Sequence, residues 1–313
     1  MVIRTDLDGI PPAPQGRAVT IGKFQAVHRG HRSLLDETAS AARRLGSLAT
    51  VLTFDRHPAE VLFGAPEALQ LGDPEERMEC LAAAGVEECV IAAVTPEFLA
   101  LTAEEFVRRI LVERLQVTAV LAGTNFRFGR GAAGGGAELS RMGSKLGFEF
   151  IEVAPTLHDG EPISSSRVAD AVAGGQVSTA AELLGRPYAV RGEVVPGRRL
   201  ARTLGFPTAN LKTEPNLLLP ADGVYAARVT LLGDSEPGVR HPAVCNLGVR
   251  PTVDGHTRTL ETHLLDWSGD LYGRTLRLEF ITRLRPEQKF PSLDALKAQI
   301  GLDAEVARTQ LDR

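Results

Sequence analysis

Residues 22–31, GKFQAVHRGH, place two histidines on either side of an Arg-Gly pair, where an apolar run gives way to a polar one. A strand is predicted before this stretch and a helix after it, and the backbone N–H groups at a helix N-terminus attract phosphate. The imidazoles of His28 and His31 can hydrogen-bond triphosphate oxygens and stabilise the charge that develops as pyrophosphate leaves. Gly30 lets a phosphate approach the backbone. Taken alone, the spacing fits a loop that holds two histidines by chance equally well.

A second polar segment, GTNFRFGRG at residues 123–131, follows another predicted strand at its carboxyl end. Asn125, Phe126 and Phe128 are candidates to line a pocket, and the arginines of the segment are candidate phosphate ligands. The AAGGG run that comes next is interpreted as a flexible loop.

A third segment, ISSSRVA at residues 163–169, follows the fifth predicted strand and opens a helix. Ser164 and Ser165, with Arg167 in the first turn, form a candidate phosphate cradle, although an N-cap alone explains the serines as well. All three segments fall at the carboxyl ends of predicted strands, where a doubly wound sheet gathers its ligands. Their convergence favours a nucleotide site.

The second half of the chain carries a different constellation in GRRLARTLGFPTANL, residues 197–211. Thr208 and Asn210 alternate along an extended segment and therefore share one face. Neutral oxygens of this kind suffice for Mg²⁺ when phosphates and waters complete the octahedron. The preceding loop, which includes Gly197 and Arg202, is a candidate cover for those phosphates. A basic loop followed by a turn is the alternative interpretation.

Phosphoryl transfer to a hydroxyl also needs a carboxylate that accepts or positions the proton. Glu261 in TLETHLLD offers one, with His263 two residues on and on the same strand face. Glu279 in RLEF is an equal alternative. A solvent-facing role is open for both carboxylates, so periodicity does not choose between them.

Alternating periodicities predict the elements that must position these groups in the first half. Apolar strand-like runs alternate with amphipathic helical stretches, a pattern typical of a doubly wound parallel sheet with helices on both faces. The predicted strands are 17–22, 48–54, 86–94, 117–123 and 148–153. The predicted helices are 32–45, 74–84, 103–115, one around 138–146, 163–175 and 178–184.

From Tyr188 onward the character of the chain changes. Short β-branched runs punctuated by Gly and Pro predict antiparallel strands in a small barrel or sandwich. Helical periodicity returns over residues 291–313. We place the boundary near residues 185–187, which gives predicted domains of residues 1–186 and 187–313.

Composition limits the class of protein. The 313 residues allow two domains, and a net charge of -4 argues against nucleic acid or an anionic membrane as a partner. No apolar run long enough to span a membrane and no signal-like start occurs. Three scattered cysteines, Cys80, Cys89 and Cys245, indicate buried thiols in a reducing compartment. We therefore expect a cytoplasmic protein.

Three motifs in this order, G-x-F-x-x-V-H-x-G-H, N-F-R-F-G and I-S-S-S-R, resemble the N-terminal module of bacterial bifunctional riboflavin kinase/FAD synthetases, which is related to the HxGH nucleotidyltransferases. The resemblance implies a Rossmann-like domain that adenylylates FMN with ATP and releases FAD and pyrophosphate. It implies that His28 and His31 are catalytic and that Asn125 lies near the nucleotide or flavin phosphate. The ATP-binding residues it implies are Gly22, His28, His31, Asn125, Ser164, Ser165 and Arg167.

The chain departs from this family pattern at four positions. Gln25 and Ala26 replace the usual Asp-Gly, Ser166 stands where Thr is usual, and Ala169 stands where a second Arg is usual. The missing Asp removes a charge that can orient donors, and the missing Arg removes a bidentate phosphate ligand. Because both histidines remain, we expect a functional adenylylation site, with a weakened one as the alternative.

The second half resembles the riboflavin kinase module over nearly all of residues 187–313, through LGFPTANL, LPADGVYAARV, NLGVRPT, ETHLLDWSGDLYGRTLRLEF and LRPEQKFPSLDALKAQI. The resemblance implies a six-stranded antiparallel barrel with a C-terminal helix, which transfers the γ-phosphate of ATP to the ribityl 5′-hydroxyl of riboflavin. It implies that Thr208 and Asn210 hold Mg²⁺ and ATP, and that Glu261, rather than Glu279, is the catalytic base. Ala201 stands where Gly is common in this loop.

The leading hypothesis is thus a bifunctional enzyme that uses ATP, Mg²⁺, riboflavin and FMN and forms FMN and FAD. A kinase whose first module no longer catalyses, and only binds flavin or acts as a scaffold, is one alternative. A flavin-sensing regulator that binds nucleic acid is another, disfavoured by the lack of a basic stripe and by the intact Thr208, Asn210 and Glu261. The sequence leaves the oligomeric state open, a homo-oligomer included.

Overall fold

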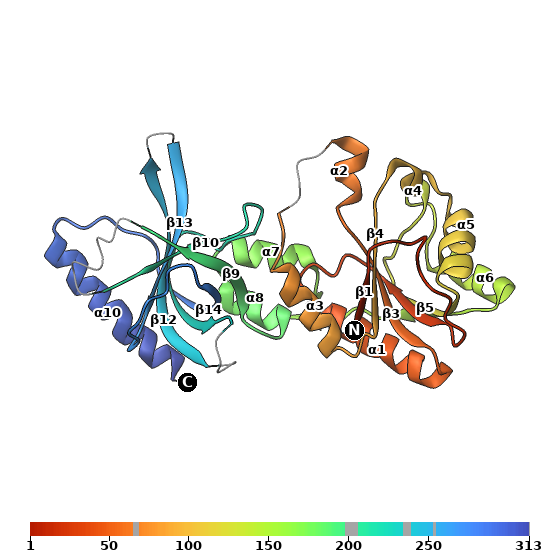
Figure 1. Ribbon diagram of the computed structural model, residues 1–313, viewed down its shortest axis with the longest axis horizontal. Helices are drawn as coiled ribbons and strands as arrows, with labels where there is room; N and C mark the ends of the chain where they lie inside the picture. Colours follow the sequence, from red (N-terminus) through yellow and green to blue (C-terminus); the bar gives the residue numbers. More distant parts are fainter. Residues whose placement is uncertain (65–68, 198–205, 234–238, 253–254, 313) are drawn as a thin grey trace. The chain divides into compact units, whose positions relative to one another are not determined.

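In a computed structural model that describes residues 1–64, 69–197, 206–233, 239–252 and 255–312, the chain forms two compact units (Figure 1). The first unit contains residues 1–69 and 74–164, and the second contains residues 70–73 and 165–313. The division by compactness thus falls before the two helices that precede the barrel. The expected domain boundary at residue 186 stays a prediction.

The first unit is built on a parallel sheet of six strands in the order β1-β4-β3-β2-β5-β6. Their bounds are β1 Val2–Arg4, β2 Arg17–Ile21, β3 Leu48–Phe54, β4 Glu88–Ala92, β5 Val117–Gly123 and β6 Glu149–Val153. The doubly wound class is confirmed, and β1 adds a strand to the five predicted. Its three residues are too few to show a strand period, and only their pairing with β4 defines them.

The helices predicted for the first unit are present, the one over 103–115 as α5 and a π-helix, and α2 and α4 add to them. Their bounds are α1 Arg29–Leu45, α2 Pro58–Phe63, α3 Pro74–Ala83, α4 Pro96–Ala100, α5 Ala103–Glu105 and α6 Gly136–Leu146, with a π-helix η1 at Phe106–Arg114 and a 3-10 turn η2 at Arg130–Ala132. Helix α1 begins at Arg29 rather than Arg32, so the second histidine of the opening motif lies inside the helix. The Gly-rich run 132–136 ends in the first residue of α6 and is held by a bridge between Phe128 and Gly134.

Strand β2 is the point at which the strand order reverses, because β3 and β4 lie on one side of it and β5 and β6 on the other. The strands β2 and β5 pair in parallel, with Thr20 opposite Leu121. Loops that leave their carboxyl ends therefore emerge side by side, which is where sheets of this class bind ligands. The HRGH turn follows β2, and Asn125 follows β5.

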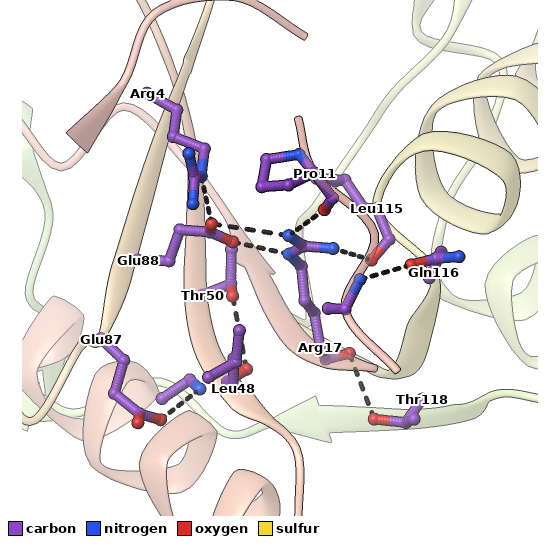
Figure 2. Close-up of polar contacts among 12 residues, drawn as sticks. Arg4, Pro11, Arg17, Leu48, Thr50, Glu87, Glu88, Leu115, Gln116 and Thr118 are labelled. Atoms are coloured by element: carbon purple, nitrogen blue, oxygen red, sulfur yellow. Dashed lines mark hydrogen bonds and ion pairs between the residues drawn. The ribbon is translucent and has the colours of Figure 1, made fainter. Parts of the chain in front are cut away.

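A buried ion-pair network closes the opposite, amino end of the same strands (Figure 2). The Arg17 side chain is 1% exposed and donates to Glu88 Oε2 at 2.6 Å, to the Leu115 carbonyl at 3.2 Å and to the Pro11 carbonyl at 3.0 Å. Arg4 of β1 donates to the other oxygen of Glu88. Burial alone would raise the pKa of Glu88, but hydrogen bonds and charge from both arginines outweigh it and lower the pKa. The network ties β1, β2 and β4 to the segments at Pro11 and Leu115, where no ligand is expected.

The second unit contains a closed barrel of six strands in the order β10-β13-β12-β11-β14-β9, and every neighbouring pair is antiparallel. Their bounds are β9 Tyr188–Val195, β10 Ala209–Lys212, β11 Gly223–Leu231, β12 Arg240–Thr252, β13 Gly255–Leu264 and β14 Thr275–Arg285. Tyr225, Leu247 and Phe280 are fully buried, as expected for side chains that fill a small barrel. The predicted six-stranded barrel is confirmed.

Among the described residues of the second unit, three helices accompany the barrel: α7 Ser165–Ala173, α8 Val177–Leu184 and α10 Leu293–Leu311. Ser292 caps α10, which packs along the outer side of the barrel through Ala304, Ala307 and Leu311 against β11 and β12 (Figure 1). A short hairpin, β7 Leu157–His158 with β8 Glu161–Pro162, belongs to the first unit. The outer face of β10 and β13 is thus left to polar side chains.

Candidate active sites

His28 caps helix α1 with its side chain. Its Nδ1 accepts a hydrogen bond from the backbone N–H of His31 at 3.2 Å, and the residue itself is 5% exposed. An Nδ1 that accepts cannot carry the proton, so the neutral ring is protonated at Nε2. The cap therefore fixes which nitrogen of His28 can donate to a ligand.

The His31 imidazole stacks on that of His28, with ring centroids 3.7 Å apart and planes 15° from parallel. Phe24 closes the other side of His31 at 4.9 Å. Burial, then the nearby His28 and Arg77, lower the pKa of His31 well below its ordinary value. The His31 ring is therefore neutral near pH 7 in this arrangement, and its Nδ1 has no hydrogen-bond partner among the described residues.

Two cations that sequence analysis missed lie beside this turn. Arg77 of α3 donates to the Thr53 hydroxyl at 2.6 Å, and that hydroxyl donates to the Lys23 carbonyl at 3.1 Å. Burial lowers the pKa of both Arg77 and Lys23. In sequence Arg77 is indistinguishable from any charged residue on a helix face, so only the packing of α3 could identify it. These side chains supply positive charge beside the neutral His31.

The unusual Gln25-Ala26 pair does not strain the turn. Phe24 and Val27 have positive φ angles of 48° and 38°, whereas Ala26 is not among the residues with positive φ. Ala26 is also only 4% exposed, so its methyl group is packed. The backbone at position 26 therefore does not require glycine, and the geometry of the turn does not favour a weakened adenylylation site.

The other predicted adenylylation residues fall into two groups. Asn125 is exposed just after β5, as predicted, but Phe128 is 7% exposed and packs 5.5 Å from Phe106 in the core instead of lining a pocket. Gly30 lies against residue 163, because a Cβ on it would come within 3.5 Å of the Ile163 carbonyl oxygen. Ser164 is thereby brought to the turn within the first unit.

Helix α7 holds the remainder of the predicted cradle. Ser165 is the first residue of α7 and Arg167 lies in its first turn, so both belong to the second compact unit. Gly22 meets the edge of the Phe24 ring, where a Cβ would lie 3.0 Å away. Gly22 thus serves the close folding of the turn itself.

In the barrel, three polar residues stand in one row across adjacent strands. Glu261 of β13 lies directly opposite Asn210 of β10 and directly opposite Asn246 of β12. Residues paired in this way share a face of the sheet. Their neighbours Leu211 and Leu260 are buried, so the row lies on the outer face of the barrel.

Thr208 joins this row from the segment that leads into β10. Its hydroxyl donates to Glu261 Oε2 at 3.5 Å, a long contact that a bound ligand can tighten. Gly197 presses on Asn210 so closely that a Cβ would overlap the amide. The structure therefore brings together Gly197, Thr208, Asn210 and Glu261 as predicted. Arg202, like Ala201, lies outside the described residues.

Glu287, between β14 and α10, forms the other wall of the row and was not predicted. The Asn246 amide donates to Glu287 Oε1 at 3.3 Å, and a Cβ on Gly248 would overlap the Glu287 carboxylate. Arg285 anchors this loop through three hydrogen bonds to Asp303, at 2.8, 3.0 and 3.1 Å. A glycine opposite a distant carboxylate leaves no local sequence signal, so the pairing could not be foreseen.

Glu279, the competing carboxylate, occupies a different place. It is 3% exposed on β14, which is separated from β13 by two strands on either side of the ring, and it pairs with Arg277 at 3.5 Å and Arg240 at 3.6 Å. Its two arginine partners give it a structural role. This arrangement supports Glu261 as the reactive carboxylate.

The row fits a magnesium ion that shares its ligands with phosphate. Thr208 and Glu261 bring oxygens within 3.5 Å of each other beside the Asn210 amide, and hard oxygen ligands are those that Mg²⁺ takes. Within the described residues, no group of three or more His, Cys, Asp or Glu could hold a metal alone. A magnesium ion held here would therefore need further ligands, such as nucleotide phosphates and water.

Comparisons with known proteins agree with both modules. Residues 184–311 match the family described as riboflavin kinase, and residues 10–167 match the family described as FAD synthetase. The bifunctional riboflavin kinase/FMN adenylyltransferase of Escherichia coli (strain K12) is 39% identical over 303 residues, covering 96% of this chain and 95% of the relative. The protein of the same name from Pseudomonas fluorescens is 40% identical over 305 residues, with 96% and 95% covered.

A crystal structure named as a macrolide-efflux protein from Streptococcus pneumoniae superposes with a TM-score of 0.88 at 31% identity, covering 98% of both chains. Its name differs from the two family matches of this chain. No helix in the described parts of the chain is long and apolar enough to cross a membrane.

A parallel-sheet nucleotidyltransferase module followed by a kinase barrel defines a two-module enzyme of flavin nucleotide synthesis. The matches cover both modules and nearly the full length of the curated relatives. This chain belongs to the bifunctional riboflavin kinase/FMN adenylyltransferase family.

Proposed function

We propose that the barrel converts riboflavin to FMN at the outer row of β10, β13 and β12. In this proposal Glu261 accepts the proton of the ribityl 5′-hydroxyl as its oxygen attacks the γ-phosphorus of ATP and ADP leaves. Thr208 and Asn210 hold the nucleotide with Mg²⁺, which neutralises phosphate charge when bound. The observation that carries the assignment is the direct opposition of Asn210 and Glu261, with Thr208 3.5 Å from the carboxylate.

The wall formed by Asn246 and Glu287 then faces the hydroxyl acceptor. An amide and a carboxylate together donate to and accept from polyol hydroxyl groups. Their contact at 3.3 Å and the Gly248 approach set the distance of this wall from Glu261. Gly197 and Arg202, which precede β10 in the sequence, remain the proposed cover for the ATP phosphates.

The first module, in our proposal, adenylylates FMN at the carboxyl ends of β2 and β5. A phosphate oxygen of FMN attacks the α-phosphorus of ATP, and pyrophosphate leaves. His28, protonated at Nε2 because Nδ1 caps the helix, donates to the phosphates together with His31. Arg77 and Lys23 add charge, and Asn125 and Ser164 are the proposed remaining ligands within the first unit.

The test is a chromatographic time course of flavins with purified protein, ATP and Mg²⁺. Riboflavin should be converted to FMN and then to FAD, and FMN supplied directly should give FAD. Absence of FMN from riboflavin would contradict the kinase assignment. Normal FMN formation without FAD from supplied FMN would show that the first module only binds flavin. In this proposal both reactions take place in the cytoplasm, as expected for a chain whose three cysteines are scattered along the sequence.

A further inference from the structure

His263 holds the segment that leads into Thr208 through two different contacts. Its Nδ1 lies 2.8 Å from the Pro207 carbonyl oxygen, and its ring meets the Phe206 ring edge-on, with centroids 5.5 Å apart and planes at 86°. A carbonyl oxygen only accepts, so Nδ1 must carry the hydrogen. One imidazole therefore contacts two consecutive residues, Phe206 and Pro207.

These contacts lie just beyond the last paired residues of β10 and β13. The ladder between β10 and β13 runs from Leu211 opposite Leu260 to Ala209 opposite Thr262. Continued by one step, it would place Thr208 opposite His263. Pro207 has no N–H to donate to a further rung, so a side chain is needed to fix the peptide that joins Pro207 to Thr208.

The anchor and the reactive carboxylate share one rigid strand. Glu261 and His263 are two residues apart on β13 and point to the same outer face, while Thr262 between them is fully buried. A bond from His263 to Pro207 therefore sets the position of the Thr208 hydroxyl relative to Glu261, whose contact is only 3.5 Å long.

We propose that His263 is a positioning residue for phosphoryl transfer, which fixes the Pro207–Thr208 peptide so that Thr208 and Asn210 face Glu261. The inference rests on the proposed kinase function of the barrel. It concerns the nucleotide side of the site, because Thr208 and Asn210 are the proposed nucleotide ligands and the acceptor wall of Asn246 and Glu287 lies across Glu261.

Two substitutions separate the hydrogen bond from the ring contact. His263→Phe keeps an aromatic ring against Phe206 but cannot donate to Pro207. His263→Asn can place an amide N–H near the position of Nδ1 but removes the ring. His241→Phe is the matched control, since His241 lies on β12 of the same barrel and pairs with Val229 rather than with any residue of the row.

We expect His263→Phe to lower kcat/KM for ATP in FMN formation about tenfold, the effect of losing roughly one hydrogen bond in the transition state. The KM for riboflavin should stay within about twofold, and His263→Asn should recover most of the loss. Amide hydrogen exchange of the peptide covering residues 206–212 should accelerate in His263→Phe and stay slow in His263→Asn. His241→Phe should match the wild type in every measurement.

Wild-type rates and wild-type exchange in His263→Phe would overturn the proposal. Equal losses in the Phe and Asn variants, with KM values for ATP and riboflavin raised alike, would also overturn it by showing that His263 acts only through packing. A wild-type protein that forms no FMN would refute the proposed kinase function instead. The exchange measurement still decides the positioning role in that case, because it needs no turnover.

Discussion

Asn210 and Glu261 stand directly opposite each other on antiparallel neighbours β10 and β13, and Asn246 stands opposite Glu261 on its other side. The carboxylate is thus held in the middle of a row of amides on the outer face of a closed barrel. A glycine packs closely at each end of the row. Gly197 lies against Asn210, and Gly248 lies against Glu287, which contacts Asn246. The site is therefore fixed by strand register, which single substitutions can probe without rebuilding the fold.

Replacing Glu261 with Gln should stop the kinase reaction selectively. The amide keeps the size of the side chain but cannot accept the hydroxyl proton, and loss of a general base typically costs about 10²–10⁴-fold in rate. FMN formation from riboflavin should fall by that factor, while FAD formation from supplied FMN stays unchanged. Glu193→Gln, an exposed carboxylate on β9, should leave both rates intact. A Glu261→Gln protein that still makes FMN at the wild-type rate would disprove the assignment.

Gly248→Ala should damage the acceptor side of the same site. The new methyl group would overlap the Glu287 carboxylate and push it away from Asn246. We expect the KM for riboflavin to rise about tenfold, or roughly 1.4 kcal/mol of lost binding, with a smaller effect on the KM for ATP. Gly301→Ala is the control: it lies in α10 with open space around it, so the melting temperature should rise slightly. An unchanged riboflavin KM in Gly248→Ala would argue against this wall.

His28 has two roles that substitution can separate, because it both caps α1 and faces the proposed phosphates. His28→Ala should lose about 1 kcal/mol of stability together with adenylyl transfer. His28→Asn should retain the cap, since Asn is a favoured N-cap residue, yet lose FAD formation about 10²–10³-fold. Thermal unfolding and FAD formation from supplied FMN measure the two effects. FAD formation at the wild-type rate in His28→Asn would limit His28 to a structural role.

The lowered pKa of His31 predicts an acid-sensitive first module. Below about pH 6.5 the unfolded chain takes up a proton at this histidine that the folded turn resists. Stability from His31 is therefore present above the unfolded pKa and declines as the pH falls towards the folded pKa. The melting temperature of the wild type should drop more steeply between pH 7 and pH 5 than that of His31→Gln. Parallel curves would mean that the ring is not held neutral.

Glu88→Gln should be among the most destabilising changes in the first unit. It leaves the buried Arg17 charge without its partner, a loss that typically costs 3–5 kcal/mol (about a third of ordinary domain stability). Because the pKa of Glu88 is lowered on folding, acid should remove the same stability as the pH falls below about 4. Glu87→Gln, whose amide oxygen can still accept from Ala49 N–H, is the control. Similar melting temperatures for both variants would contradict the network's importance.

Most of the fold could be predicted, because it rests on local periodicity. Strands β3 and β5 have the predicted bounds, and the closed barrel follows the predicted class. The start of α1 was placed too late because a histidine acts as its N-cap, which Ser, Thr, Asn and Asp usually do. Strand β1 was not predicted, because three residues are too few to show a strand period.

The site could be predicted only where its residues follow one another in a motif. His28, Asn125, Thr208 and Glu261 lie in short recognisable runs and at strand ends or along strands, where the fold makes them useful. Arg77, Asn246 and Glu287 act through contacts between segments far apart in sequence, and Phe128 looks like a pocket residue until its packing is known. Such contacts depend on register and side-chain volume, which periodicity does not encode.

Because the barrel is closed and the parallel sheet is open, the two units differ in their risk of aggregation. Each strand of the barrel pairs with a neighbour on both sides, so none of them lies at the edge of a sheet. The parallel sheet ends in two edges, β1 and β6, of which β1 is three residues long and β6 carries Glu149 and Glu152. The short length of β1 and the negative charges on β6 discourage pairing with strands of other molecules. Heated or acidified samples should therefore begin to aggregate through the first unit, once these protected edges open.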